Sequence, residues 1–169
     1  QMLSEKLIDR GGRMQKNHSR FSSKNNLDEF VLVSEEERGG KSAITVTQKD
    51  VREIQLAKGA IRTGIQVLLE ATNMIAEDIE QVVIAGAFGS YIDISNAITI
   101  GMLPALPLDH FQQVGNAAGT GARIALVSSA SRRKAQHMAS SMHYIELGAV
   151  LNFNEIFINS MFLEPYKSR

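Results

Sequence analysis

The chain has 169 residues, 44% of them hydrophobic and 21% charged, which is typical of one soluble globular domain. Its 18 Lys plus Arg balance 18 Asp plus Glu, so the net charge of zero gives no support for a nucleic-acid or anionic-membrane partner. It contains no cysteine, which excludes disulfides, thiolate catalysis and cysteine-ligated metal sites within the chain. No apolar run approaches the roughly 18 residues needed to cross a membrane, and no signal peptide is evident, so we expect a cytoplasmic protein. Since Gln1 is not a natural start, we also expect a fragment of a longer protein.

Residues 1–41 differ in composition from the rest of the chain. Apolar residues at 2–8 predict a short amphipathic helix that ends at the following glycine pair. Residues 10–24 hold five Lys or Arg, one His and no acid; we interpret them as a solvated basic loop, with a docking patch for an acidic partner as the alternative. Apolar runs at 30–33 and 42–47 predict two neighbouring strands joined by an acidic turn.

The clearest element is a long helix over residues 48–71. Thr47 and Asp50 have the spacing of a helix start. Gly59 and Gly64 lower the helix propensity, so we expect them to mark close packing onto a sheet. Apolar residues recur at three- and four-residue steps and predict the buried stripe: Val51, Ile54, Ala57, Ile61, Ile65 and Leu68.

Residues 81–90 form the stretch around which the chain is organised. Uncharged apolar residues, three of them β-branched, run directly into a turn that holds Gly86 and Gly89. Continuous apolar strands of this kind are typical of a parallel sheet buried on both faces. Ligands of open α/β sheets bind at the carboxyl ends of such strands.

The elements that follow give a mixed α/β order. They are a short helix capped by Ser95, a weak strand at 111–114, a glycine-rich turn at 115–122, helices over 122–128 and 131–142, a strand at 144–147, a helix from Asn152, and a loose polar tail over 164–169.

We expect the two glycine-rich turns to meet and to form one side of a nucleotide pocket. Taken singly, each turn is more often plain packing than a ligand site, whereas two such turns, each after a strand, make the two interpretations about equal. The second turn lacks the Gly-Lys-Ser/Thr ending of a P-loop, and Ile124 stands where a dinucleotide motif has its third glycine. The helix after it still offers free N–H groups to an anion or polar ligand.

The residues predict no catalytic set and no metal site. His137 and His143 are six apart, a spacing that does not place both on one helix face. Asp93 either binds a ribose hydroxyl or supports the start of the next helix, and we favour the second interpretation. Lys58 and Arg62 lie off the apolar stripe and either face a ligand or form a solvated flank, which we favour.

Four blocks in order resemble a known family: TQKDVREIQLAKGAI at 47–61, IAGAFGSYID at 84–93, IGMLP at 100–104 and VGNAAGTGAR at 114–123. They are similar to the C-terminal domain of the reductive activators of corrinoid proteins, over about residues 42–163. The resemblance implies α/β architecture, as a single actin-like (ribonuclease H-like) ATPase lobe with a mixed sheet flanked by helices. Its superfold unites acetate and sugar kinases, heat-shock chaperones and actin.

Whole members of this family join a ferredoxin-like iron–sulfur domain to two lobes that clasp ATP. They use ATP to drive the reduction of an inactive Co(II) corrinoid to Co(I), so that methyl transfer can resume. The resemblance therefore implies a set of nucleotide-binding residues: Gly86, Ala87, Phe88, Gly89, Ser90, Gly115, Asn116, Gly119 and Gly121, with Asp93, Lys58 and Arg62 as further candidates.

The aspartate-bearing phosphate loops of the superfold have no counterpart in the chain. We therefore expect this chain alone to be inactive, with ATP or ADP bound together with Mg that another lobe holds, and an iron–sulfur cluster only in the full-length protein. The implied partners are a corrinoid protein, the protein's own N-terminal domains and a second copy of the chain. We divide the chain into a linker or start of the lobe with a basic loop (1–41), the C-terminal ATPase lobe (42–163) and the loose tail (164–169).

Two alternatives stay open at this point. The domain is either the nucleotide-binding lobe or a dimerisation or docking module for a corrinoid protein, without independent nucleotide binding. A weaker option is a relative that activates a radical or dehydratase enzyme.

Overall fold

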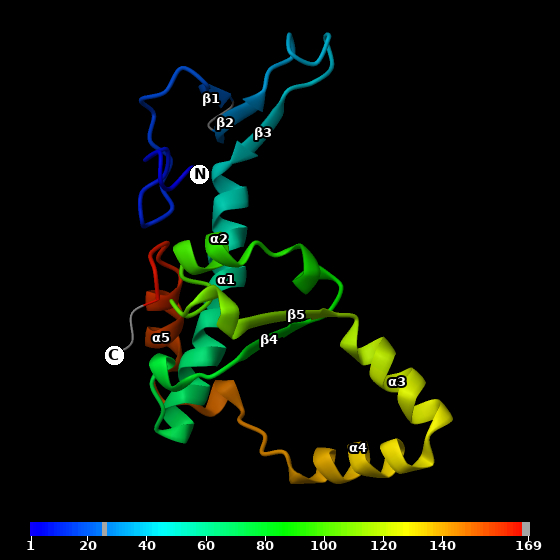
Figure 1. Ribbon diagram of the computed structural model, residues 1–169. Coiled ribbons are helices and arrows are strands. Elements are labelled where there is room, and N and C mark those ends of the chain that lie inside the picture. The colour runs from blue at the N-terminus through cyan, green and yellow to red at the C-terminus, as the bar shows by residue number, and fades with distance from the viewer. Residues whose placement is uncertain (25–26, 167–169) are drawn as a thin grey trace.

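A long central helix organises the chain. The computed structural model describes residues 1–24 and 27–166. Helix α1 (Gln48–Thr72) has an antiparallel sheet at its N-terminal end and a parallel pair of strands beside its C-terminal half (Figure 1). The predicted α/β architecture is confirmed.

The antiparallel sheet contains one strand more than predicted. Its order is β1 (Phe21–Lys24), β2 (Leu27–Val33) and β3 (Ile44–Thr47), and the expected pairing of β2 with β3 is confirmed. Strand β1 lies in the stretch expected to be a solvated basic loop, and Phe21 pairs with Phe30. The wrong prediction arose because a four-residue strand with two serines carries no apolar alternation.

The residues before β1 form turns rather than the predicted helix. Lys6 has a φ of +57°, which interrupts helical backbone, and Ile8 forms an isolated bridge with Met14. Ile8 and Met14 are buried against Val51 and Leu163, so this segment contributes to the core without being helical.

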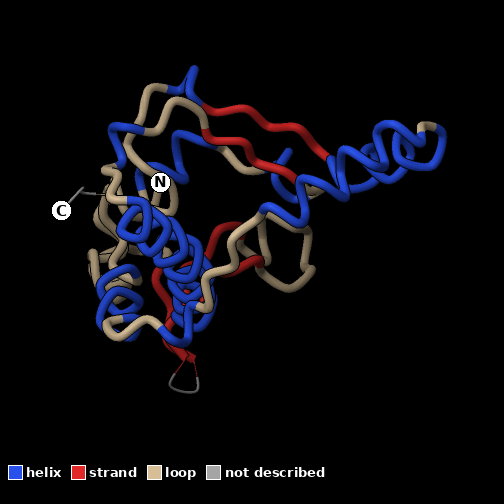
Figure 2. The backbone as a smooth tube through the Cα atoms, turned by 90° about the horizontal axis from the view of Figure 1, so that it is seen from below, coloured by secondary structure: helices blue, strands red, loops and turns tan. Residues whose placement is uncertain are grey.

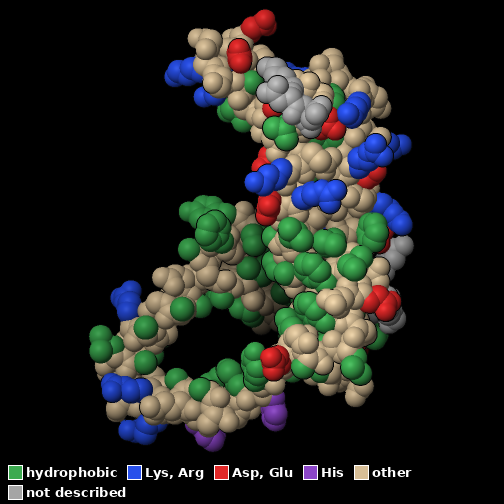
Figure 3. All heavy atoms as spheres, turned by 180° about the vertical axis from the view of Figure 1, so that it is seen from behind, with side chains coloured by type: hydrophobic (Ala, Val, Ile, Leu, Met, Phe, Trp, Pro, Cys, Tyr) green, Lys and Arg blue, Asp and Glu red, His purple; other side chains and the backbone are tan. Residues whose placement is uncertain are grey.

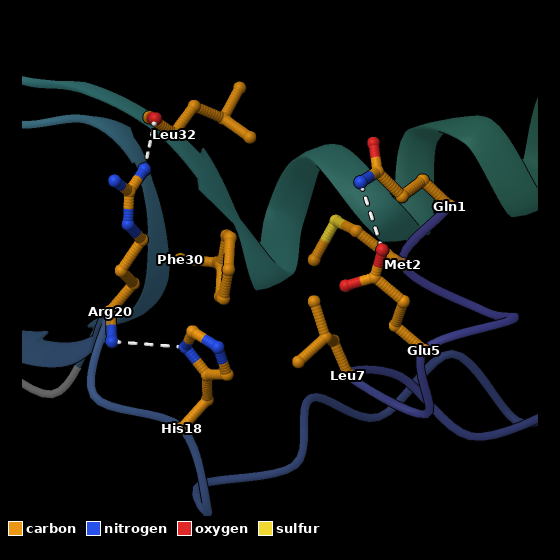
Figure 4. A pocket seen from close by; sticks show the side chains of 8 residues that line it. All are labelled: Gln1, Met2, Glu5, Leu7, His18, Arg20, Phe30 and Leu32. Carbon is orange, nitrogen blue, oxygen red and sulfur yellow. Dashed lines mark hydrogen bonds between the residues drawn. The ribbon is translucent and has the colours of Figure 1, made fainter.

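A pocket of about 310 Å³ separates these turns from the antiparallel sheet, and Figure 4 shows the side chains that line it. The Arg20 guanidinium donates a 2.7 Å hydrogen bond to the Leu32 carbonyl and a 3.0 Å bond to the Glu37 carboxylate. The backbone N–H of Arg20 donates to Nδ1 of His18 at 3.1 Å. The basic stretch is therefore partly tied to the sheet.

Helix α1 begins at the predicted cap. The Thr47 hydroxyl accepts a 3.2 Å hydrogen bond from the Asp50 N–H, and the Asp50 carboxylate accepts a 2.8 Å bond from the Thr47 N–H. The hydrogen bonds that the Thr47 N–H and the Thr47 hydroxyl donate to the carboxylate lower the pKa of Asp50. The helix ends at Asn73 in the left-handed conformation, with φ +53°.

The buried face of α1 contains only part of the predicted stripe, including Val51, which is 6% exposed. Ile54, Ile61 and Leu68 are 55%, 43% and 55% exposed. The buried face instead includes polar residues, among them Gln55 and Lys58. The rest of the prediction was wrong because it assigned burial by hydrophobicity alone, whereas the C-terminal segment packs on α1 partly through polar side chains.

The two glycines of α1 do not mark packing onto a sheet. A Cβ on Gly59 would lie 3.1 Å from Cγ of Met161, so the lack of a side chain at Gly59 allows the C-terminal segment to pack closely on α1. A Cβ on Gly64 would meet nothing within 4 Å.

The parallel pair follows α1 as a strand–helix–strand unit. Strand β4 (Val82–Ala85), helix α2 (Ile94–Thr99) and strand β5 (Phe111–Gly115) form it, and the register runs from Val82 opposite Phe111 to Ala85 opposite Gly115. Both strands were predicted. Burial on both faces was not confirmed, because Val83 is 53% exposed.

The next two helices form an arm that extends away from the body. They are α3 (Ala117–Val127) and α4 (Ser129–Ser141), and neither has a buried residue. Figure 2 shows this arm projecting beyond the parallel strands, and Figure 3 shows that it encloses an opening. The strand predicted at 144–147 does not form, since no described strand pairs with it.

The chain returns to α1 through helix α5 (Phe153–Ser160) and the segment after it. The start of α5 at Asn152 was predicted. The tail was predicted to be loose from Glu164, but Leu163 and Tyr166 are only 4% and 6% exposed. The Tyr166 hydroxyl donates a hydrogen bond to Gln66, which fixes the segment on α1. Residues 167–169 lie outside the described residues.

Candidate functional site

The two glycine-rich turns meet at the carboxyl ends of β4 and β5. The Gly86 N–H donates a 2.6 Å hydrogen bond to the Gly115 carbonyl. Both residues have positive φ, +107° and +60°, which favours glycine. The predicted juxtaposition of the turns is therefore observed, at the edge where open α/β sheets place their ligands.

The surroundings of Gly86 and Gly89 differ. A Cβ on Gly86 would meet nothing within 4 Å, so its backbone borders open space that a ligand can approach. A Cβ on Gly89 would lie 2.8 Å from Cγ2 of Ile84. Gly89 is thus a packing glycine that lets the turn fold back on β4.

A short 3₁₀ turn (Phe88–Tyr91) follows Gly86 and presents two aromatic rings. The side chains of Phe88 and Tyr91 are 89% and 88% exposed. Ser90 lies beside the second turn, since a Cβ on Gly115 would be 3.5 Å from its Oγ.

Sequence reasoning missed Gln113, which fixes this turn from the neighbouring strand. Its Nε2 donates to the carbonyl oxygens of Gly89 at 2.5 Å and Ile92 at 2.9 Å. The available signal was a glutamine pair inside a strand that leads into a glycine turn, because a strand side chain with two amide donors is suited to hold neighbouring carbonyls.

The second turn is shorter than predicted, because α3 begins directly after Asn116. The Asn116 side-chain oxygen caps the helix by accepting a 2.9 Å hydrogen bond from the Gly119 N–H. Gly119 and Gly121 are therefore helical, and the predicted helix start at residue 122 was late. A Cβ on Gly119 would lie 2.6 Å from Nδ2 of Asn116, so glycine there leaves room for the cap.

Asp93 caps a helix, as favoured from the sequence. Its carboxylate accepts a 2.8 Å hydrogen bond from the Asn96 N–H at the start of α2. Ser95, the predicted cap, lies one residue inside the helix.

Lys58 and Arg62 face the C-terminal segment rather than forming a solvated flank. Lys58 is 1% exposed and its Nζ donates a 2.5 Å hydrogen bond to the Phe162 carbonyl. Burial, and secondarily the charge of Arg62, lowers the pKa of Lys58 to about 8. The Arg62 guanidinium lies 5.0 Å from the centre of the Tyr166 ring. Their contacts give both residues a structural role in holding this segment.

Within residues 1–24 and 27–166, no group of three or more His, Cys, Asp or Glu side chains is arranged to hold a metal ion. In the same described ranges, no helix is both long enough and apolar enough to span a membrane.

Two known proteins are similar to this chain in sequence. The chain is 41% identical over 139 residues to "Corrinoid activation enzyme RamQ" of Eubacterium limosum, a match that covers 82% of this chain and 23% of that protein. It is 38% identical over 61 residues to "[Co(II) methylated amine-specific corrinoid protein] reductase" of Methanosarcina barkeri, covering 36% of this chain and 11% of that one.

A solved structure, "Reductive activator for corrinoid,iron-sulfur protein", superposes with a TM-score of 0.86 at 34% identity. The match covers 97% of this chain and 26% of the other. The chain thus spans about a quarter of the length of this structure and of the RamQ relative.

The family model described as "C-terminal domain of RACo the ASKHA domain" matches residues 1–169, which includes the first 41 residues that the resemblance did not cover. The predicted actin-like α/β lobe is confirmed by this match and by the structural superposition. The chain belongs to the family of RACo C-terminal ASKHA domains.

Proposed function

We propose that this chain is the nucleotide-binding lobe of an ATP-dependent reductive activator, which returns an inactive Co(II) corrinoid protein to Co(I) for methyl transfer. The lobe supplies the adenosine side of the ATP site. The observation that carries the proposal is the contact between Gly86 and Gly115, both at positive φ, at the carboxyl ends of two parallel strands. The names of the relatives and of the superposed structure support the corrinoid role.

The residues present fit a nucleoside. The space that a side chain on Gly86 would occupy is open. Asn116 caps a helix of 11 residues, and the first N–H groups of this helix point toward its N-terminus. Backbone of Gly86, Ala87 and Gly115 would border the nucleoside, and the Ser90 hydroxyl would face it from beside Gly115. Gly119 and Gly121 would contribute through the first turns of α3.

The chemistry divides between this lobe and the rest of the activator. When bound, ATP supplies the free energy of phosphoanhydride hydrolysis that makes the cobalt reduction favourable. The residues of this chain bind and orient the nucleoside, while the proposed Mg ligands and iron–sulfur cluster belong to other parts of the protein. The described residues of this chain place no acidic cluster at the site.

Calorimetric titration of ADP and ATP into the whole protein tests the proposal. Gly86→Val places a branched side chain in the open space and strains a φ of +107°, so nucleotide affinity should fall by roughly tenfold or more. The matched control is Gly64→Ala, where a Cβ meets nothing within 4 Å and φ is helical. Equal affinity of the Gly86→Val protein and the control would refute the assignment of the site.

The exposed rings of Phe88 and Tyr91 favour a second candidate function, a dimerisation or docking module for a corrinoid protein. Exposed aromatic residues are enriched at the centres of protein interfaces. If docking is the function, Phe88→Ala should weaken binding of the corrinoid protein while ADP affinity stays unchanged. Loss of ADP affinity without any change in docking would support the nucleotide-binding function.

A further inference from the structure

The arm formed by α3 and α4 is basic, whereas the rest of the chain is acidic. No Asp or Glu occurs between Asp109 and Glu146, and this stretch holds four Lys or Arg: Arg123, Arg132, Arg133 and Lys134. Because the whole chain has a net charge of zero, the remaining residues carry a net charge of −4. Positive charge is thus concentrated on an element that projects from the body (Figure 2).

Hydrogen bonds fix the second helix of the arm against the first. Nε of Arg132 donates a 3.0 Å hydrogen bond to the Ala125 carbonyl, and its Nη2 donates a 3.4 Å bond to the Leu126 carbonyl. Ser128 caps α4 by accepting a 3.2 Å bond from the Ser131 N–H. Arg132 therefore positions α4, and the other basic side chains of α4 are held on a helix of defined orientation.

Two faces of α4 differ in chemistry. Arg133 and Lys134 lie four and three residues before His137, so these three exposed side chains share one face. Met138 and Met142, four residues apart, lie on the opposite face. Figure 3 shows Lys, Arg and His side chains on the outer rim of the arm and hydrophobic side chains along the opening that the arm encloses. Among residues 1–24 and 27–166, no ion pair involves Arg133 or Lys134.

The composition of the arm favours an acidic protein as the partner over nucleic acid or a membrane. Helices α3 and α4 contain no Phe, Tyr or Trp, so they offer no rings on which the bases of a single strand could stack. A helix that lies in a membrane surface carries large apolar residues such as Trp, Phe or Leu beside its basic face, whereas the apolar residues of α4 are Ala and Met. Carboxylates of a protein surface need only the exposed cations that α4 presents.

We infer that the outer face of α4, formed by Arg133, Lys134 and His137, is an electrostatic docking surface for an acidic protein. Carboxylates of the partner would pair with Arg133 and Lys134, and the positive potential of the whole arm would speed up association. Single contacts between exposed charges are weak, so the partner must engage several cations together. The docking surface includes neither the glycine-rich turns nor Phe88, so the inference does not depend on nucleotide binding.

Titration of poly-L-glutamate into the whole protein tests the inference, with this polymer as the model of an acidic protein surface. Arg133→Glu combined with Lys134→Glu should weaken binding by roughly tenfold at about 50 mM salt. Lys49→Glu combined with Arg52→Glu is the matched control, because it makes the same change in net charge at exposed positions of α1. The control should bind nearly as well as the unaltered protein. Higher salt should weaken binding, less steeply in the Arg133 and Lys134 variant.

Further variants and probes decide the remaining outcomes. Arg133→Gln combined with Lys134→Gln should give a smaller loss in the same direction, and circular dichroism should show that all variants stay folded. Equal losses in the α4 variant and the α1 control, or no binding by the unaltered protein, would overturn the inference. Polyuridylate and vesicles of phosphatidylserine and phosphatidylcholine test the other partner classes. Tighter binding to either than to poly-L-glutamate, lost in the α4 variant, would assign the face to nucleic acid or a membrane and would also overturn it.

Discussion

The ammonium group of Lys58 lies 2.5 Å from the carbonyl oxygen of Phe162, inside the contact between α1 and the C-terminal segment. On the preceding turn of the helix, Gln55 donates a 3.1 Å hydrogen bond to the Met161 carbonyl. Two adjacent carbonyls of the segment are therefore held by two side chains of α1. A buried polar group is stabilising only while it is hydrogen-bonded, so this contact depends on both side chains.

The protonation of Lys58 should make stability depend on pH. Its pKa is about 8 in the folded chain, against an ordinary 10.5, so the unfolded chain binds more protons between these values. The free energy of unfolding should therefore rise as pH increases from about 8 to about 10, and stay level in this respect below about 8. Urea denaturation across this range measures the slope.

The control for this experiment is Lys58→Met, in which the rise should disappear. Above about pH 10 the opposite contribution of Tyr166 begins, because burial raises the pKa of its hydroxyl in the folded chain. A rise of the same size in the Lys58→Met chain would assign the pH dependence to another group.

Replacing Gly101 should displace the C-terminal segment. Gly101 has a φ of +71°, and a Cβ there would overlap the carbonyl oxygen of Glu164. Gly101→Ala should lower the free energy of unfolding by about 2–4 kcal/mol, from backbone strain and overpacking together. Gly148→Ala, where a Cβ meets nothing within 4 Å, should leave it nearly unchanged. Thermal unfolding of the two variants makes the comparison.

Gln113→Leu should loosen the turn between Gly86 and Ile92. The substitution removes two hydrogen bonds and leaves the Gly89 carbonyl, which is partly buried, without its donor, at a cost of about 1–3 kcal/mol. Gln112→Leu on the same strand is the control, since the side chain of Gln112 accepts a hydrogen bond from the side chain of Gln81 at an exposed position. Denaturant titration should show the loss for Gln113→Leu alone; equal losses would mean that the turn does not depend on Gln113.

Gly86→Ala should destabilise the chain even without a ligand. At a φ of +107° any L-residue is strained, which costs about 1–2 kcal/mol although the Cβ meets no atom. Gly64→Ala should instead stabilise α1 by about 0.5–1 kcal/mol, because glycine is a poor helix former. Urea denaturation of both variants should therefore give changes in the free energy of unfolding with opposite signs. That result would assign the loss at Gly86 to backbone strain and not to packing of the added Cβ.

Elements with strong local signals were predicted well. Helix α1 follows from the cap at Thr47, and β4 follows from its β-branched run into Gly86. The parallel pairing brought the Gly86 and Gly115 turns together as expected, because strands joined through a helix end at the same edge of a sheet. The binding of a nucleotide there stays a prediction.

The sequence was a poor guide where burial depends on distant partners. The stripe through Ile54 and Leu68 has the periodicity of a core face, yet it is exposed in this chain. Lys58 has the composition of a surface residue, yet it is buried by a segment about a hundred residues later. Local periodicity shows that a face is apolar but not which part of the protein covers it.

The arm of α3 and α4 leaves the body at β5 and rejoins it at α5, so the pieces on either side of the arm are joined by more than the covalent chain (Figure 1). Trypsin has basic cleavage sites at Arg132, Arg133 and Lys134, all on the exposed surface of α4. Cleavage at these sites should not separate the two fragments under native conditions, because the shorter fragment stays packed on α1 through Met161–Tyr166. The two fragments should separate only in denaturant, and a tag on one should recover both.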